Sequence, residues 1–319
     1  MIAEIGIDLI KAQKKLENGD LVAIPTETVY GLAANALDPL AVSKIYAAKN
    51  RPSFDPLIIH VGKIEDFKTY TVDFPAELLE LANKFCPGPI TFLVKKSEII
   101  PEITTSGLEK VAIRIPKHPL TLELLNKLNF PLAAPSANPF GYVSPTTATH
   151  VYEQLGERIP YILDGGPCKV GLESTIVGCE NENLIIYRKG GLDLDELRKV
   201  FSGEILIKDH SSSNPQAPGM LSKHYSPKKR IEILSKNTIL DLMDKKSTGL
   251  LRYNTPIAGF ENQIVLSGKS DLNEAAFRLF DALRQFDKMD IQKVYIELVP
   301  EKGLGIAIND RLRRAAAKS

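Results

Sequence analysis

Residues 38–61 of this 319-residue chain read DPLAVSKIYAAKNRPSFDPLIIHV. Asp38 is a good N-cap and Pro39 fits the first helical position, so a helix is predicted over Pro39–Asn50. The apolar run Leu57–Val61 follows after a short turn and predicts a strand. A helix that leads directly into an apolar strand is typical of a sheet that is covered by helices.

The same alternation continues on both sides of this stretch and predicts an α/β (α+β) domain built on a twisted sheet. An amphipathic spacing from Ile5 to Leu16 predicts a first helix that ends near Asn18-Gly19. The other predicted helices are Ala76–Lys84, Leu120–Leu128, Thr146–Leu155 and Leu194–Phe201. The other predicted strands are Leu21–Ile24, Thr91–Val94, Val111–Ile115, Leu132–Ala134, Tyr161–Leu163, Thr175–Val177 and Leu184–Tyr187.

A change of composition near residue 206 divides the chain in two. Residues 210–227 read HSSSNPQAPGMLSKHYSP, which is rich in serine and proline and is typical of an interdomain linker. We therefore predict a first domain over residues 1–205, a linker over 206–229 and a small α/β domain over 230–319. The second domain has predicted strands at Ile231–Leu234, Thr248–Leu251, Ile264–Leu266 and Val294–Leu298, and a helix around Ala276–Leu283.

Composition excludes several classes of protein. The formal net charge of +1 argues against a chain that holds nucleic acid mainly by its phosphates, although it leaves a local basic cleft open. No apolar run approaches the ~20 residues of a membrane span, and the N-terminus lacks the basic flank of a signal peptide. Cys86, Cys168 and Cys179 lack metal-ligand spacing, which predicts free thiols in a reducing cytoplasm.

The familiar nucleotide-binding and hydrolase motifs are missing. Gly268-Lys269-Ser270 would need a glycine where Gln263 stands to form a P-loop. Gly303-Leu304-Gly305 lacks the third glycine of a dinucleotide fingerprint, and no Gly-x-Ser-x-Gly elbow occurs.

Cationic side chains recur at the ends of predicted elements. Lys49 lies in the last turn of the helix predicted over Pro39–Asn50, Arg51 follows that helix, and His60 ends the next apolar strand. An anion site and a purely structural role, through the helix dipole and snorkelling, are equally compatible with them. Arg114 lies in the apolar run VAIRIP, where its planar fork suits a carboxylate or phosphate; an internal salt bridge to an Asp or Glu would serve as well.

Small polar side chains accompany these cations. Thr26 follows a strand end, where a capped turn is the alternative to a ligand site. The stretch PSANPFGYVS carries Ser136, Asn138 and Ser144, and Ser174 stands at the mouth of another strand. Arg188 follows a further apolar strand. No nucleophile–base pair emerges, so the set fits charge stabilisation in phosphoryl or nucleotidyl transfer better than acyl chemistry.

Seven motifs in order carry a resemblance to a known family: PTETVYGL, K-x-R before PLIIHV, CPGPITF, VAIRIP, PSAN, GLESTIV and APGMLSKHYSP. The chain resembles the YrdC-like threonylcarbamoyl-adenylate synthases in their two-domain form. The resemblance implies a concave YrdC-like mixed sheet with a basic cavity, a linker that folds over it, and a small Rossmann-like domain.

The resemblance also implies an activity. Family members condense L-threonine, bicarbonate or CO2 and ATP to L-threonylcarbamoyl-AMP and pyrophosphate, with Mg2+ on the ATP and no organic cofactor. The product passes to a separate transferase that modifies adenosine 37 of tRNAs reading codons that begin with A. A weak contact with tRNA is a further expectation.

Site residues follow from the same resemblance. Threonine is expected at Thr26, His60, Arg114 and Ser174. ATP is expected at Lys49, Arg51, Ser136, Asn138, Ser144, Arg188 and Tyr225, with Lys49 and Arg51 acting electrostatically. His224 and Tyr225 are expected to form a linker lid, and no protein ligand is expected for the metal.

The sequence departs from the family pattern at two positions, and two other functions are possible alternatives. Arg188 lies in YRKGGL where the family more often has Arg-Pro-Gly, and Cys86 replaces a common aromatic. An RNA-binding module with a basic concave surface is one alternative, although the near-neutral charge and lack of stacking aromatics weigh against it. A hydrogenase-maturation carbamoyltransferase is another, and the cysteine pattern excludes the zinc-finger-like modules of that class.

Overall fold

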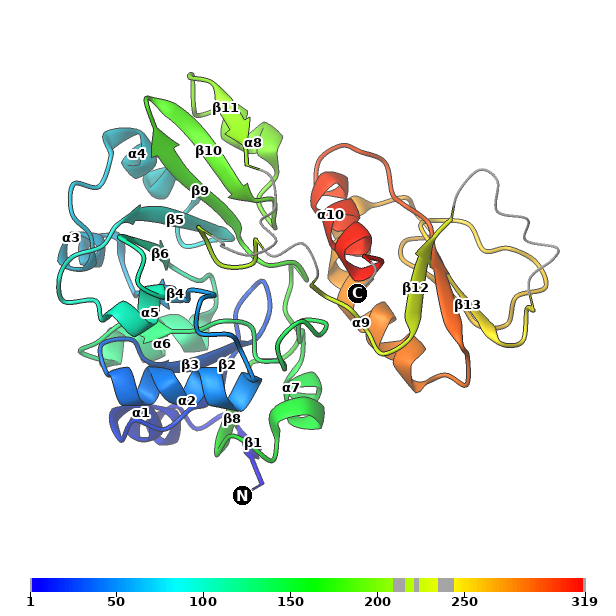
Figure 1. The fold of residues 1–319 in the computed structure, drawn as a ribbon, viewed down its shortest axis with the longest axis horizontal. Helices are drawn as coiled ribbons and strands as arrows, with labels where there is room; N and C mark the ends of the chain where they lie inside the picture. Colours follow the sequence, from blue (N-terminus) through cyan, green and yellow to red (C-terminus); the bar gives the residue numbers. More distant parts are fainter. Residues whose placement is uncertain (1, 209–215, 221–223, 235–243, 318–319) are drawn as a thin grey trace.

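A computed structural model describes residues 2–208, 216–220, 224–234 and 244–317. Figure 1 shows two bodies, each built on its own sheet, with α10 on the side of the second body that faces the first. Among the described residues, no helix is both long enough and apolar enough to cross a membrane.

The first sheet has eleven strands in the order β1-β8-β2-β3-β7-β4-β6-β5-β9-β10-β11. Parallel and antiparallel neighbours alternate irregularly, so the sheet is mixed, as predicted. Its strands are β1 (Glu4–Gly6), β2 (Val22–Ile24), β3 (Gly31–Asn35), β4 (Ile58–His60), β5 (Ile90–Lys95), β6 (Lys110–Arg114), β7 (Leu132–Ala133), β8 (Tyr161–Leu163), β9 (Thr175–Glu180), β10 (Asn183–Arg188) and β11 (Ile205–Ile207).

Helices flank this sheet and bury their apolar stripes against it. The helix of the opening stretch, α2, begins at Pro39 because the Asp38 carboxylate accepts from the Leu40 amide, and it ends at Lys49 before a left-handed Asn50. The others are α1 (Leu9–Glu17), η1 (Ile64–Asp66), α3 (Phe67–Tyr70), α4 (Ala76–Phe85), α5 (Glu102–Thr105), α6 (Pro119–Lys127), α7 (Ala148–Leu155) and α8 (Leu194–Arg198).

The prediction for the N-terminus was wrong at its start. Ile5 belongs to β1, which pairs with β8, and the helix begins only at Leu9 because Asp8 caps it. Strand β3 was not predicted, because its sequence GLAAN has small residues with low strand propensity. It forms because it is sandwiched between β2 and β7 in the fully buried sheet.

The second sheet has the order β12-β15-β13-β14 and is parallel throughout, as in a Rossmann-like domain. Its elements are β12 (Arg230–Ile233), β13 (Thr248–Arg252), β14 (Gln263–Val265), α9 (Leu272–Lys288), β15 (Lys293–Ile296) and α10 (Gly305–Ala315). The fold class predicted from the sequence is confirmed.

Part of the expected linker crosses the first sheet. Ala217 and Met220 are buried in an apolar cluster that includes Ile58 and Ile176 of that sheet. Residues 209–215 and 221–223 of the predicted linker lie outside the described residues. The segment Gln216–Met220 therefore covers the sheet where the strand-end cations lie.

Candidate active site

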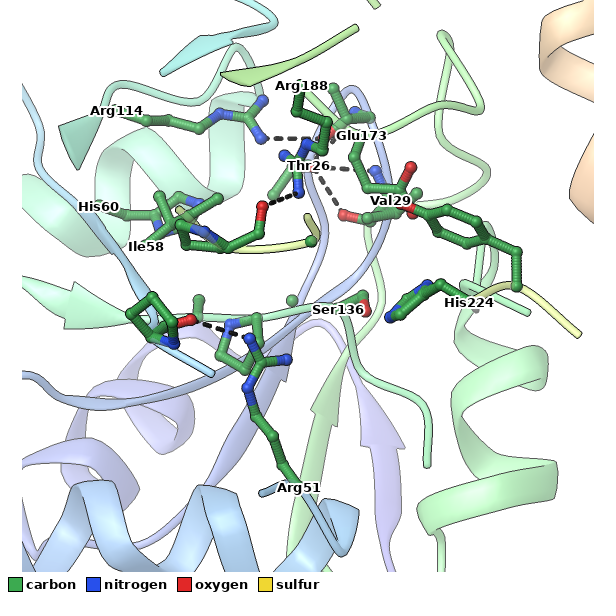
Figure 2. A pocket seen from close by; sticks show the side chains of 18 residues that line it. Thr26, Val29, Arg51, Ile58, His60, Arg114, Ser136, Glu173, Arg188 and His224 are labelled. Carbon is green, nitrogen blue, oxygen red and sulfur yellow. Dashed lines mark hydrogen bonds between the residues drawn. The ribbon is translucent and has the colours of Figure 1, made fainter. Parts of the chain in front are cut away.

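A cavity lies between the first sheet and the linker (Figure 2). Its volume is about 50 Å³, which is room for only a few water molecules. The linker residues Pro218, Gly219, His224 and Tyr225 form part of its wall. Its other lining residues are Thr26, Thr28, Val29, Gly31, Arg51, Pro56, Ile58, His60, Arg114, Ala134, Pro135, Ser136, Glu173 and Arg188.

Arg114 ends β6 and is held by the loop after β2. One terminal nitrogen donates to Glu27 Oε1 at 2.7 Å and the other to Thr28 Oγ1 at 3.0 Å. The side chain is only 4% exposed, and its Nε has no partner among the described residues. Arg114 thus has the internal salt bridge that the sequence left open, and its side chain also lines the cavity.

Thr26 forms the turn that carries Glu27 and Thr28. Its hydroxyl accepts from the Thr28 and Val29 amides and donates to the Val29 carbonyl at 2.6 Å. This is the capped turn that the sequence left open, and the same residue lines the cavity.

His60 is the register partner of Arg114 on the neighbouring parallel strand β4. Burial, reinforced by the charge of Arg114, lowers the pKa of His60 to about 3. The ring is therefore neutral at pH 7, and its Nδ1 has no partner among the described residues.

Arg51 enters the cavity from the turn after α2. It forms an ion pair with Asp55 at 2.9 Å and donates to the Asp55 and Pro56 carbonyls. Burial raises the pKa of Asp55, although the charges of Arg51 and Lys49 act in the opposite direction. The pair holds the guanidinium in one orientation.

Lys49 lies behind the cavity and not in its wall. Its Nζ donates to the carbonyls of Ser136 and Asn138, both at 2.5 Å. Burial, and next the charge of Arg51, lower the pKa of Lys49 well below its ordinary value. The Asn138 amide donates to the Tyr142 carbonyl, so the loop PSANPFGYVS is fixed at several points and presents Ser136 to the cavity.

Arg188 reaches the cavity from the end of β10, beyond a shift of register that redirects the strand. It donates to the carbonyl and hydroxyl of Ser174, each at 3.0 Å, and Ser174 also bonds the Thr91 hydroxyl at 2.7 Å. Burial lowers the pKa of Arg188 to about 10, so the side chain keeps its charge at pH 7.

Glu173 brings a fully buried carboxylate into the same wall. Its Oε1 accepts from the Ser144 hydroxyl at 2.5 Å, and its Oε2 accepts from Arg311 of α10 at 3.0 and 3.1 Å. Burial alone would raise the pKa of Glu173, but Arg311 and Arg188 hold it below the usual value.

The linker pair closes the cavity from the other side. Tyr225 stacks on Phe280 of α9 with ring centroids 5.5 Å apart, and His224 meets it edge-on at 4.1 Å. Tyr225 has a positive φ of 64°, and its hydroxyl has no partner among the described residues. Burial, and next the charge of Arg314, lower the pKa of His224 well below its ordinary value.

The structure thus brings most of the expected site residues to one cavity. Those that line it are Thr26, Arg51, His60, Arg114, Ser136, Arg188, His224 and Tyr225. Those that support it from behind are Lys49, Asn138, Ser144 and Ser174.

Sequence reasoning did not assign the carboxylates that hold the arginines. Glu27 and Glu173 lie inside the motifs PTETVYGL and GLESTIV, and Asp55 lies four residues after Arg51. These positions were the signals from which the three carboxylates could have been assigned. Arg311 offered none, because it comes from the other domain. In the described ranges, no three acidic, histidine or cysteine side chains gather to hold a metal ion.

Comparisons with known proteins match both domains of the chain to one family. A family model described as "Telomere recombination" matches residues 14–190, and one described as "Threonylcarbamoyl-AMP synthase, C-terminal domain" matches residues 192–317. The threonylcarbamoyl-AMP synthase of Pyrococcus abyssi is 39% identical over 94% of this chain and 92% of its own length. That of Bacillus subtilis is 38% identical over 97% and 92%, respectively.

A solved structure agrees in three dimensions. The crystal structure of P. abyssi Sua5 complexed with L-threonine superposes with a TM-score of 0.90 at 38% identity. It covers 99% of this chain and 97% of the other.

Proposed function

This chain belongs to the Sua5 family of two-domain threonylcarbamoyl-AMP synthases, and on that premise we propose that its cavity joins L-threonine, bicarbonate or CO2, and ATP into threonylcarbamoyl-AMP. The chain is accordingly an adenylate-forming nucleotidyltransferase. The observation that carries the proposal is the convergence of three guanidinium groups, from Arg51, Arg114 and Arg188, on one small cavity. Such a concentration of fixed cations suits a carboxylate and a triphosphate together.

Threonine occupies the side of Arg114 in this proposal. The unpartnered Nε of Arg114 is a buried donor for the substrate carboxylate, while Glu27 fixes the other face of the guanidinium. Thr26 lies beside it, and neutral His60 adds no second positive charge that would repel the threonine amine. Ser174 acts by holding Arg188.

ATP occupies the side of Arg51, Ser136 and Arg188. In this proposal Lys49, Asn138 and Ser144 support the ATP site indirectly. Lys49 and Asn138 hold the loop that carries Ser136, and Ser144 holds Glu173. Direct contact of any of them with a phosphate requires an exchange of their present hydrogen bonds. Mg2+ would be held mainly by the phosphate oxygens of ATP, because this cation prefers oxygen ligands and commonly binds in proteins through substrate phosphates.

The chemistry needs two bond-forming steps. The threonine amine attacks CO2, derived from bicarbonate by loss of water, and gives a carbamate after its proton leaves to solvent. A carbamate oxygen then attacks the α-phosphorus of ATP, the bond to the β-phosphate oxygen breaks, and pyrophosphate departs. The role of the arginines is to stabilise the charge that grows on pyrophosphate.

The linker acts as a lid over the reacting groups. A cavity of about 50 Å³ is too small for either substrate, so the segment with Pro218, His224 and Tyr225 must shift to admit them. Renewed closure would keep water from the carbamate. Truncation after about residue 205 should therefore lower product yield, and unchanged kinetics would make the linker a passive tether.

The proposal also covers the roles of the three parts of the chain, the fate of the product and the location of the protein. The division into residues 1–205, 206–229 and 230–319 gives the catalytic, lid and Rossmann-like parts. The product passes to a tRNA threonylcarbamoyl transferase, with at most weak direct contact to tRNA. The free thiols of Cys86, Cys168 and Cys179 support a cytoplasmic location.

The proposal is tested by pyrophosphate release. The purified chain is incubated with ATP, Mg2+ and bicarbonate, and each amino acid is added in turn. We expect release that depends on L-threonine far more than on serine or valine. Release that is independent of the amino acid would overturn the assignment.

A further inference from the structure

Arg311 of α10 reaches across the domain boundary and ends behind Glu173, a residue of the cavity wall. Its Nε and one terminal nitrogen donate to Glu173 Oε2, and its other terminal nitrogen pairs with Asp310 at 2.9 Å. The Arg311 side chain has no exposed surface. The second domain therefore places a cation behind a cavity whose walls come from the first domain and the linker.

The negative charge of Glu173 would oppose the binding of a nucleotide, and the positive charge of Arg311 offsets it. Its carboxylate is buried in the same cavity wall as Arg51 and Arg188, where the triphosphate is proposed to bind. An unpaired negative charge there would repel the phosphates, and low local polarity would strengthen the repulsion. Arg311 cancels that charge, while the Ser144 hydrogen bond satisfies the remaining carboxylate oxygen.

The same helix also fixes the lid. The guanidinium carbons of Arg311 and Arg314 lie 5.1 and 4.7 Å from the ring centre of Tyr225. Arg314 also donates to the Gly219 carbonyl at 2.9 Å. The linker segments 216–220 and 224–229 therefore each contact α10 as well as the cavity.

We propose that Arg311 is a positioning residue for the nucleotide, which neutralises Glu173 and holds Tyr225 over the cavity. The second domain then supports the phosphate side of the cavity from behind. This inference rests on the proposed function, because it requires ATP to bind in this cavity.

The first test compares R311M with R313M in the full-length chain. Arg313 is a matched control, since it lies two residues away on the same helix, is half exposed and pairs with Glu301 on the surface. Calorimetric titration with pyrophosphate and with ATP should show about tenfold weaker binding for R311M, and less than about twofold change for R313M. The threonine KM of R311M should change less than its ATP KM. Equal affinities for R311M and R313M would overturn the inference.

A double variant separates charge from packing. In E173Q/R311M the charge of Glu173 is gone while the contact with Tyr225 stays lost, so pyrophosphate affinity should be at least about threefold higher than in R311M. Failure of this rescue would refute neutralisation of Glu173 as the role of Arg311.

The E173Q single variant covers the case in which R311M does not fold. It keeps Arg311 and removes the negative charge, so pyrophosphate should bind more tightly than to wild type. Tenfold weaker binding would mean that the phosphates need the carboxylate, which contradicts the inference. A wild-type chain that neither binds ATP nor releases pyrophosphate would instead refute the proposed function.

Discussion

Substitution of Arg114 should separate stability from substrate binding. In Arg114→Ala, Glu27 loses its partner in a pair whose side chains are 4% and 6% exposed. Leaving one charge of a buried pair uncompensated costs about 3–5 kcal/mol. In Arg114→Ala/Glu27→Gln no such charge is left, and the amide can still accept from the Lys117 backbone N–H, as the carboxylate does at 2.9 Å.

The two variants should therefore differ in stability but not in threonine binding. We expect the catalytic-domain unfolding temperature of the single variant to fall on the order of 10 °C, and the double variant to recover at least half of this. Both variants lose the charged donor to the threonine carboxylate, which is worth about 3 kcal/mol or roughly a hundredfold in threonine KM.

The assay combines thermal unfolding with threonine-dependent pyrophosphate release at saturating ATP. Arg198→Ala serves as the control, because that side chain is 60% exposed and its ion pair lies on the surface. The reasoning fails if the double variant regains a threonine KM within about threefold of wild type, or if the single variant is as stable as wild type.

Three further perturbations follow from the cavity and its supports. Since the pKa of His60 is about 3 in the fold against 6.5 ordinarily, the unfolded chain binds a proton that the folded chain excludes. The stability that is present above pH 6.5 is thus lost on acidification, by about 2 kcal/mol from pH 7 to 5, and His224 acts in the same direction. The free energy of unfolding, measured by urea denaturation at each pH, should therefore depend less steeply on pH in His60→Gln than in wild type. An unchanged dependence on pH would contradict this. Lys49→Met should weaken ATP binding about tenfold and threonine binding less, because two loop carbonyls lose their donor; calorimetry that shows equal losses would count against it. Gly219→Ala should raise the ATP KM, because φ is +76° and the new Cβ would lie 2.9 Å from a nitrogen of Arg188; wild-type kinetics would exclude that clash.

Local signals in the sequence predicted the fold well. The cap at Asp38, the proline beside it and the apolar run before His60 correspond to α2 and β4 in the structure. Strand β3 escaped prediction because burial between two neighbours, and not the propensity of GLAAN, stabilises it. Ile5 was assigned to a helix because its spacing fits one, whereas pairing with β8 decides its structure.

The site was predictable only in part, because charge partners are set by tertiary structure. Arg114 was a candidate from its strand alone, but nothing local indicated that Glu27, 87 residues away, would pair with it. Arg311 and Glu173 lie 138 residues apart, in different domains. The position of Lys49 at a helix end left an anion site and a structural role open, and the hydrogen bonds of its amine to two loop carbonyls depend on the packing of a segment that is distant in sequence.

The central claim is that this cavity joins carbon dioxide, threonine and ATP in one product. The most direct measurement is the mass spectrum of the nucleotide product formed from L-threonine, ATP and bicarbonate labelled with carbon-13. We predict threonylcarbamoyl-AMP that is one mass unit heavier than the product from ordinary bicarbonate, released together with pyrophosphate. An adenylate of threonine without the extra carbon, or no adenylate at all, would contradict the account.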